Sequence, residues 1–396
     1  MLKSFFICAV LAVPAAAAKT SYEPLPAELR ELSRKGLDAV YAVTLPEAQK
    51  YFDEAVKKYP AHPFGHFGAA MVKWAHFEYL EDESDPALDK EYEALTDKAI
   101  DVGDKWLKKH PGDANAHMCI GGMHGLRARL ALLQHRWIKA YFEGRKALSH
   151  TRKALELDPE LYDAYLGLGM YEYYAGTLSG VVKILARFFM KGDAEEGLKY
   201  LNLCREKGYF NSTAAKLILI EIYTQTDSKY ADPKTAVKWS RELRAKYPDH
   251  AQMHFVEIVS LFENRQYAES RASAEDYLRR LESGDPVYRP NYLPRILVAL
   301  GTIYLVEHDY QKGLEKFLRA RQTLKKDPDA HPTRWAVWAV VRAGHALDLQ
   351  GLRDKSREYY REALSYKDEW GFGDYIKPYF KNPFEKTDLP GSLPPP

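Results

Sequence analysis

The chain has 396 residues, and its 57 Lys and Arg residues almost balance its 55 Asp and Glu residues, giving a formal net charge of +2. Its 24 Gly and 22 Pro residues are ordinary numbers for a globular protein and exclude a low-complexity or collagen-like chain. The balanced charge also argues against the concentrated basic face that nucleic-acid binding requires, so we expect no nucleic-acid partner.

Residues 1–18 predict an export signal. One lysine precedes an apolar run that ends at Val13, and a proline and four alanines close the segment at Ala18. This order is typical of a cleaved secretory signal peptide, whereas a retained membrane anchor requires about 20 apolar residues. We therefore expect a linker over residues 19–28 and a mature protein that is periplasmic or secreted, without stable insertion into a membrane.

From residue 29 to residue 370, apolar residues recur at three- and four-residue spacing, and the short alternating segments typical of strands are almost absent. This predicts an all-α body built from helix hairpins. A longer spacing of about 34 residues also recurs, with a small residue at position 8, a small one at 20, a bulky one at 24, a small one at 27 and often proline at 32. The first unit carries all five: Gly36, Ala48, Phe52, Ala55 and Pro60.

Roughly eight such units cover residues 29–370. Two late units repeat the pattern clearly, with Gly301, Tyr304, Gly313, Phe317 and Ala320 in the seventh and Gly344, Leu347, Ser356, Tyr360 and Ala363 in the eighth. The third unit holds Gly121 and, after an insertion, Ala154 and Pro159, which predicts lengthened or interrupted helices. Prolines after the second helix of several units stop that helix, because proline cannot continue a helix interior.

The pattern resembles the tetratricopeptide repeat, or TPR. The resemblance implies a right-handed α-solenoid of about eight helix hairpins with insertions in units two to four. Small residues at positions 8 and 20 let two helices approach, and the bulky residue at 24 fills the space against the next unit. Cys204 takes a buried small-residue position and Cys119 lies on the first helix of the preceding unit, so we do not expect a disulfide between them.

Unit four contains an insert at about residues 177–191. Its run Val181–Met190 is apolar except for two cations that share one helical face. We expect an extra helix packed on the solenoid; the alternative is a helix that docks to a partner or makes weak interfacial contact with a membrane through residues 181–190. The insert and the glycines after it resemble uncharacterised exported bacterial TPR proteins and are similar to a eukaryotic inclusion-body-clearance TPR family, which specifies no activity.

Motifs for catalysis are missing. Ser179 has the wrong spacing for a nucleophile elbow and follows no predicted strand, and the chain has no zincin, P-loop or EF-hand pattern. His117, His124 and Cys119 could offer soft ligands to copper, but on a helix Cys119 points away from the two histidines. We therefore predict no enzyme, no cofactor and no metal site.

The TPR resemblance places the concave surface on positions 2, 5, 9 and 12 of each first helix. Transferred to this sequence, these positions give an apolar, aromatic set of candidate contacts: Phe64, Phe67, Met71, Trp74, Met170, Tyr173, Tyr223, Phe255 and Phe262. Such a wall would bind a hydrophobic helix or an extended apolar segment. The TPR clamp for a C-terminal carboxylate requires Lys and Asn, and only Lys216 is present. The insertions in units two to four could instead fill this groove, and the sequence leaves both possibilities open.

The sequence thus predicts an exported, non-enzymatic scaffold that binds a protein or peptide partner on its concave surface. The alternative is a periplasmic glycan-binding accessory protein, because 28 Tyr and 7 Trp residues could stack on sugars. An enzyme with a site in the insertions is a third possibility without a supporting motif. Residues 371–396 are expected to cap the last unit and end in a Pro-rich tail.

Overall fold

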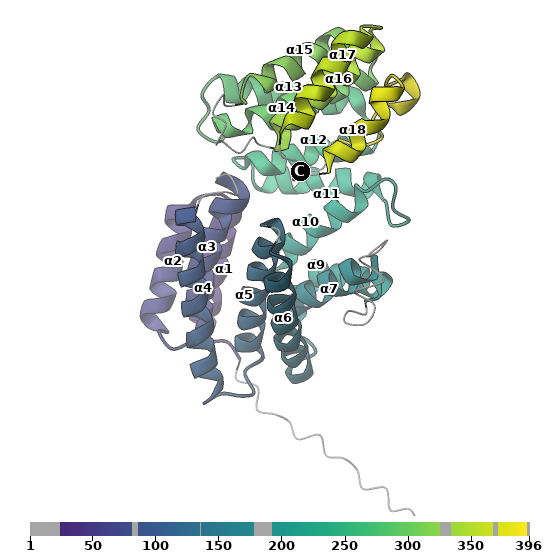
Figure 1. The fold of residues 1–396 in the computed structure, drawn as a ribbon. Helices are drawn as coiled ribbons and strands as arrows, with labels where there is room; N and C mark the ends of the chain where they lie inside the picture. Colours follow the sequence, from purple (N-terminus) through teal and green to yellow (C-terminus); the bar gives the residue numbers. More distant parts are fainter. Residues whose placement is uncertain are drawn as a thin grey trace, which may run out of the picture.

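The computed structural model describes residues 24–80, 86–134, 136–177, 192–324, 334–366 and 371–393. In these ranges the chain is all-α and contains no strand, as predicted (Figure 1). The expected signal peptide and residues 178–191 of the expected insert lie outside the described residues.

The described helices form eight successive pairs, and the two helices of each pair contact each other. The pairs are α1 (Ala27–Tyr41) with α2 (Leu45–Lys58), α3 (Pro63–Ala75) with α4 (Pro86–Leu107), α5 (Ala114–Leu133) with α6 (Trp137–Leu157), α7 (Tyr165–Thr177) with α9 (Ala194–Lys207), α10 (Ser212–Tyr223) with α11 (Pro233–Lys246), α12 (Ala251–Glu263) with α13 (Tyr267–Glu282), α14 (Leu293–Val306) with α15 (Tyr310–Arg321), and α16 (Arg334–Leu349) with α17 (Arg353–Ser365). A π-helix, η1 (His76–Leu80), extends α3, and α5 and α6 have 20 and 21 residues. The helices of unit three are therefore lengthened and not interrupted.

Glycines of the first helices receive bulky side chains of the second helices. The ring of Phe52 lies against Gly36 of its own unit and Gly68 of the next, and a Cβ atom added to Gly36 would lie 2.5 Å from Phe52 Cζ. The same contact joins Gly301 to Phe317, where an added Cβ would approach the ring to 2.4 Å. Positions 8 and 24 therefore have the packing roles that the repeat pattern predicts.

The turn between the two helices of a unit has the same backbone geometry in four units. Each turn has one residue in the left-handed region: Val43, Arg265, His308 and Gly351, with φ of 58°, 61°, 67° and 74°. The following residue donates its N–H to the carbonyl five residues earlier, as from Thr44 to Ala39 at 3.0 Å. This bond satisfies a carbonyl at the end of the first helix.

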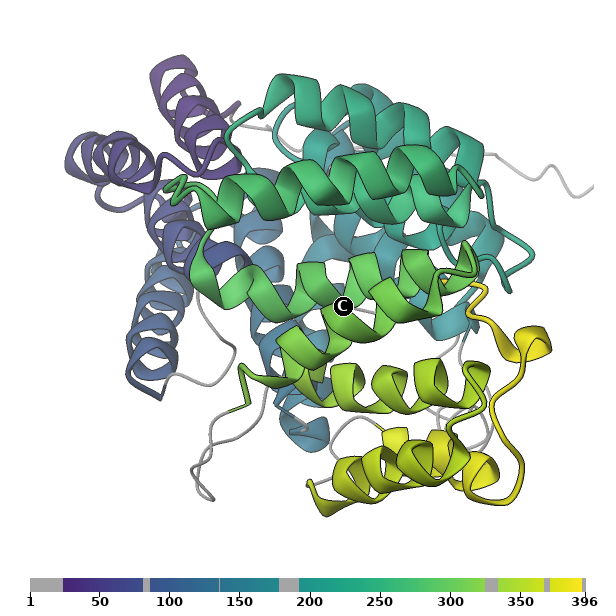
Figure 2. The same ribbon diagram turned by 90° about the horizontal axis from the view of Figure 1, so that it is seen from above.

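The first unit folds back onto the middle of the chain. Tyr41, at the end of α1, shares a buried cluster with residues of α10, α11 and α12, and its ring centroid lies 5.9 Å from that of Tyr247. Phe210, in the loop between α9 and α10, packs against Phe64 of α3 with ring centroids 5.0 Å apart. Figures 1 and 2 show the purple N-terminal helices beside the teal helices of units five and six. The solenoid therefore curls far enough for its first unit to contact its fifth and sixth.

One buried carboxylate holds the loop that makes this contact. Asp163, in the 3₁₀ turn η2 (Tyr162–Ala164), accepts N–H bonds from Tyr209, Phe210 and Asn211 at 3.1, 2.8 and 2.8 Å. Burial raises the pKa of Asp163, and the three N–H bonds oppose that rise. These bonds fix the position of Phe210 and with it the closure of unit one.

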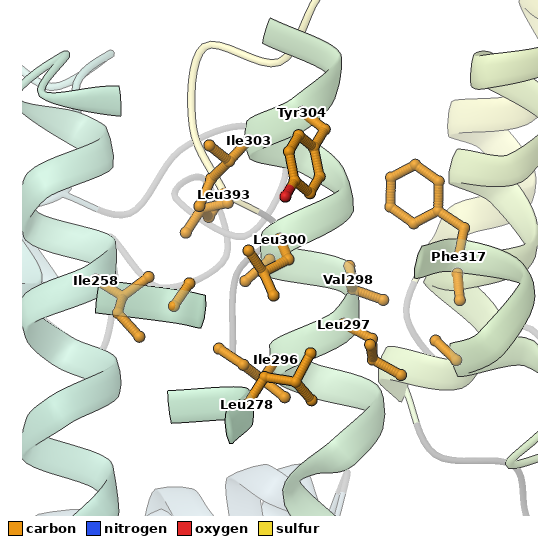
Figure 3. Close-up of a cluster of buried hydrophobic side chains, with 14 of the residues drawn as sticks. Ile258, Leu278, Ile296, Leu297, Val298, Leu300, Ile303, Tyr304, Phe317 and Leu393 are labelled. Carbon is orange, nitrogen blue, oxygen red and sulfur yellow. The ribbon is translucent and has the colours of Figure 1, made fainter. Parts of the chain in front are cut away.

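Units six to eight share a single apolar core. Side chains of α12, α13, α14 and α15 meet there, among them Ile258, Leu278, Ile296 and Phe317, and Leu393 from the C-terminal segment joins them (Figure 3). Helix α18 (Phe372–Lys381) then packs on α16 and α17 through Phe372 and Ile376. Side chains from the end of the described chain therefore pack against the core of the last three units.

Candidate functional site

The predicted aromatic wall is mostly internal in the structure. Five of the nine candidate contact residues have exposures of 0–5%: Phe64, Trp74, Tyr173, Phe255 and Phe262. Neighbouring residues cover these rings: Phe210 lies on Phe64, Tyr92 of α4 on Trp74, and Tyr267 on Phe262. These five therefore pack internally in the structure, and the sequence had left open whether they line a groove or pack internally.

The other four candidates are partly buried: Phe67, Met71, Met170 and Tyr223. Met71 packs at the edge of two clusters, and Tyr223 stacks obliquely on Trp239 with ring centroids 5.6 Å apart. A role in partner binding stays a prediction for these residues.

Polar side chains that the repeat positions did not indicate meet along the layer of first helices. In this layer α1 contacts α3, α3 contacts α5, and α5 contacts α7. Four residues from η1, α5, α7 and α10 form what we call the polar row: Glu78, Arg129, Tyr174 and Glu221. Four successive units therefore contribute one polar group each.

The polar row is held by short contacts at both ends. Glu78 accepts a hydrogen bond from Arg129 Nη2 at 2.9 Å and another from Trp74 Nε1 at 2.5 Å. The Arg129 guanidinium also lies 5.7 Å from the centroid of the Trp74 ring. At the other end, the Tyr174 hydroxyl donates to Glu221 Oε1 at 3.1 Å. Trp74, although buried, thus orients the carboxylate of Glu78.

Glu221 differs from the other carboxylates of the polar row. Its side chain is exposed, and among the described residues no cation lies within 4.0 Å of it. Even so, the surrounding protein desolvates the carboxyl group and raises its pKa, while Arg129 and the Tyr174 hydrogen bond act in the opposite direction. An accessible but poorly solvated carboxylate gains free energy from an incoming cation or N–H donor. The polar row therefore has an acceptor that a ligand can reach.

A cavity of about 860 Å³ lies where units one and two meet the loops before α12 and α14. Both apolar and charged side chains line the cavity, among them Val43, Lys73, Glu91, Asp249, Arg289 and Tyr292. Lys73 and Glu91 pair with each other at 2.8 Å, so these two charges are already matched. The cavity is a consequence of the closure of the first unit onto the later units.

The largest exposed apolar side chains gather at the turn between α5 and α6. Leu132, Leu133, Trp137, Ile138 and Phe142 are 43–77% exposed. Clusters of this kind on a folded protein mark contact surfaces. The lengthened helices of unit three carry this cluster at the tip of their hairpin, and the repeat positions did not point to it. No described helix is long and apolar enough to cross a bilayer.

The histidines of α5 face α6. His117 Nδ1 lies 3.0 Å from His150 Nδ1, and His124 Nδ1 lies 2.6 Å from Glu143 Oε2. Burial and the neighbouring histidines lower the pKa of His150 to about 4. Cys119 lies elsewhere, buried in a cluster with Leu29 and Phe64.

No three His, Cys, Asp or Glu residues in the described ranges form a group able to hold a metal ion. The two cysteines in the described part of the chain, Cys119 and Cys204, are buried free thiols.

Comparisons with known proteins give fold-level likenesses. No family model and no curated protein sequence matches the chain. A solved tetratricopeptide repeat protein from Parabacteroides merdae shares 15% identity over 76% of this chain and 94% of its own, with a TM-score of 0.31. The human IFIT1 dimer with PPP-AAAA shares 12% identity over 86% and 82%, with a TM-score of 0.43. NprR with its cognate peptide NprX shares 13% over 91% and 87%, with a TM-score of 0.42. The TPR-like character of the chain rests on its own glycine-to-aromatic packing and helix pairing.

Proposed function

We propose that this TPR-like helical repeat is an exported, non-enzymatic scaffold that binds a basic peptide segment of a protein partner along its layer of first helices. The observation that carries the proposal is Glu221, an exposed carboxylate that has no cation partner in the described part of the chain and lies on a surface built by four units. A Lys or Arg side chain of the partner would supply the missing charge.

The arrangement of the polar row favours a peptide over a small ion. The Arg129 guanidinium pairs with Glu78, so the charge of that carboxylate is already matched, and Arg129 acts on Glu221 only electrostatically. A ligand that pairs with Glu221 therefore brings a second cation into the field of Arg129. An extended peptide can do this, because main-chain groups next to its basic residue can hydrogen-bond to the Tyr174 hydroxyl and the Arg129 guanidinium.

The test begins with a random peptide library displayed on phage and selected on the immobilised protein. Peptides recovered by the wild type are expected to be enriched in Lys or Arg. Their affinity, measured by fluorescence anisotropy, should fall at least tenfold with Glu221→Gln, since a charge-assisted hydrogen bond contributes roughly 1.5–3 kcal/mol.

Glu242→Gln is the matched control, because Glu242 is an exposed carboxylate of α11 that pairs with Lys216 away from the polar row. The Glu242→Gln variant should bind the selected peptides with the same affinity as the wild type. Selected peptides without basic residues, or equal binding by wild type and Glu221→Gln, would contradict the proposal.

Export is a separate part of the proposal and rests on the first 18 residues. Cell fractionation followed by N-terminal sequencing of the mature protein tests it, with a new terminus expected close to Lys19. Retention of Met1 in a cytoplasmic fraction would refute it. Glycan binding is not favoured, because large aromatic rings such as Phe64, Trp74 and Phe255 are internal and cannot stack on sugars.

A further inference from the structure

The chain beyond α18 returns to units six to eight and is fixed there at two points. Phe384 N–H donates to Asp348 Oδ2 at 2.9 Å, and Leu393 N–H donates to Glu263 Oε1 at 2.9 Å. Asp348 lies near the end of α16, and Glu263 is the last residue of α12. Both carboxylates are buried, so each main-chain bond is made away from bulk water.

Side chains reinforce the two fixed points. The Phe384 ring stacks on His345 with centroids 3.9 Å apart and planes 10° from parallel. Leu393 is 4% exposed and lies beside Ile303 in the core shown in Figure 3. Between them, Arg265 Nη1 donates to the carbonyl of Gly391 at 2.6 Å.

The middle of this segment is more exposed than its two fixed points, although Leu389 is partly buried against the same core. Residues 385–388 and 391–392 are exposed, and the 3₁₀ turn η4 (Lys386–Asp388) is the only helical part of residues 382–393. A segment with only two fully buried side chains and little regular secondary structure has lower local stability than the helices it covers. It can therefore leave its position while the helices beneath it stay folded.

We propose that the surface around Glu263, Arg265, His345 and Asp348 is a binding track for an extended peptide of another protein, and that residues 384–393 fill it in the isolated chain. The track recognises main-chain N–H and C=O groups through the carboxyl groups of Glu263 and Asp348 and the Arg265 guanidinium. Its preferred ligand has an aromatic side chain for His345 and an aliphatic one nine positions later for the core beside Ile303. This surface lies in units six to eight, so the proposal stands independently of the polar row.

The buried carboxylates explain why the track requires an occupant. Asp348 keeps bonds from Arg353 and Tyr360 if the tail leaves. Glu263 would lose its Leu393 N–H bond, and its Oε2 atom is already buried without a hydrogen-bond partner. A buried carboxyl group without partners is costly, so an incoming segment that supplies an N–H group there replaces the tail at little net cost.

The experiment uses a fluorescent synthetic peptide of residues 383–396 and the full-length chain. In the double variant Phe384→Ala with Leu393→Asp, the tail is weakened and the track is left intact. The labelled peptide should bind this variant at least tenfold more tightly than the wild type, where the attached tail competes. A peptide with the same two substitutions should not bind. Lys386→Ala, in the exposed middle of the tail, is the control and should behave as wild type.

Circular dichroism and thermal melting establish that the double variant is folded. Failure of the folded double variant to bind the peptide, or collapse of units six to eight in that variant, would overturn the proposal. Hydrogen exchange on the wild type is a second measurement: the amides of Phe384 and Leu393 should exchange at least a hundredfold faster than those of α14. Equal rates would show that the tail is a fixed part of the core.

Discussion

Gly36 and Gly144 both lie in helices but differ in what surrounds them. An added Cβ at Gly36 would lie within 2.8 Å of three atoms of the buried Phe52 ring, whereas at Gly144, inside α6, it would have no heavy atom within 4 Å. Gly36→Ala should therefore lower the free energy of unfolding by about 1–3 kcal/mol through overpacking. Gly144→Ala should raise it by about 0.5–1 kcal/mol, because alanine restricts the unfolded chain and favours helix.

Denaturant titration of both variants measures this difference. Gly36 is thus a position where the repeat demands glycine, and Gly144 is one where it does not. A neutral Gly36→Ala would mean that Phe52 can move aside, and that the repeat pattern at position 8 does not depend on close helix approach.

Glu263 makes the stability of units six to eight depend on pH. Burial raises its pKa from 4.5 to about 8. The folded chain therefore holds a proton that the unfolded chain has released, so stability falls as the pH rises from about 4.5 to about 8, in total by a few kcal/mol. Glu263→Gln should remove this pH-dependent loss of stability. The variant should be about as stable as the wild type at pH 5 and more stable than the wild type at pH 9.

Thermal melting at several pH values between 5 and 9 provides the check. Glu315→Gln, on the exposed face of α15, should leave the pH profile unchanged. If wild type and Glu263→Gln lost stability in parallel as the pH rose, the carboxyl group would be ionised in the folded protein, and its contact with Leu393 would be charge-assisted.

At the scale of elements, the turn after α1 contains a strained residue. Val43 has φ of 58°, where a β-branched side chain clashes with its own backbone at a cost of about 1–3 kcal/mol. Gly351 has the same place in unit eight without that strain. Val43→Gly should raise the free energy of unfolding by up to about 1 kcal/mol after the entropic cost of glycine is subtracted.

His308→Gly is the comparison for this turn, because His308 has φ of 67° without a branched Cβ and its ring bonds to the Tyr310 hydroxyl at 3.0 Å. His308→Gly should raise the free energy of unfolding by less than Val43→Gly does, or lower it. A destabilised Val43→Gly would indicate that the side chain of Val43, which lines the cavity between the early and late units, contributes more than its strain costs.

The sequence is sufficient to predict the hairpins but not which faces stay open. Gly36 and Phe52 are close in the chain, so their packing follows from the repeat spacing alone. Phe64 is buried by Phe210, which belongs to a loop far along the chain and to no repeat position. Glu221 could not be singled out either, because its significance depends on Arg129 and Tyr174 from other units. Contacts between distant units decide the site, and no local pattern records them.

Tyr41 links the first unit to the fifth and sixth. It is 8% exposed and packs against Tyr247. An open solenoid transmits a local loss only to neighbouring repeats. Tyr41→Ala should instead increase hydrogen exchange in α1 and in α10 to α12 together, and it should lower overall stability by about 2–4 kcal/mol.

Tyr304→Ala is the matched control, because Tyr304 is 7% exposed and lies in the core of the last units. Its effect on exchange should stay within α12 to α17. Protection that Tyr41→Ala lowers only in α1 to α3 would show that the contact between unit one and units five and six adds little to stability.

The return of α1 onto α10, α11 and α12 also bears on truncation mapping. Deleting the first hairpin would uncover the apolar side chains Ile220, Leu243 and Met253, so a shortened chain would be prone to aggregate. Loss of an activity after such a deletion would not locate that activity in the missing segment. Point substitutions such as Glu221→Gln leave the contact of α1 with α10, α11 and α12 intact. They are therefore the appropriate way to assign roles to individual repeats.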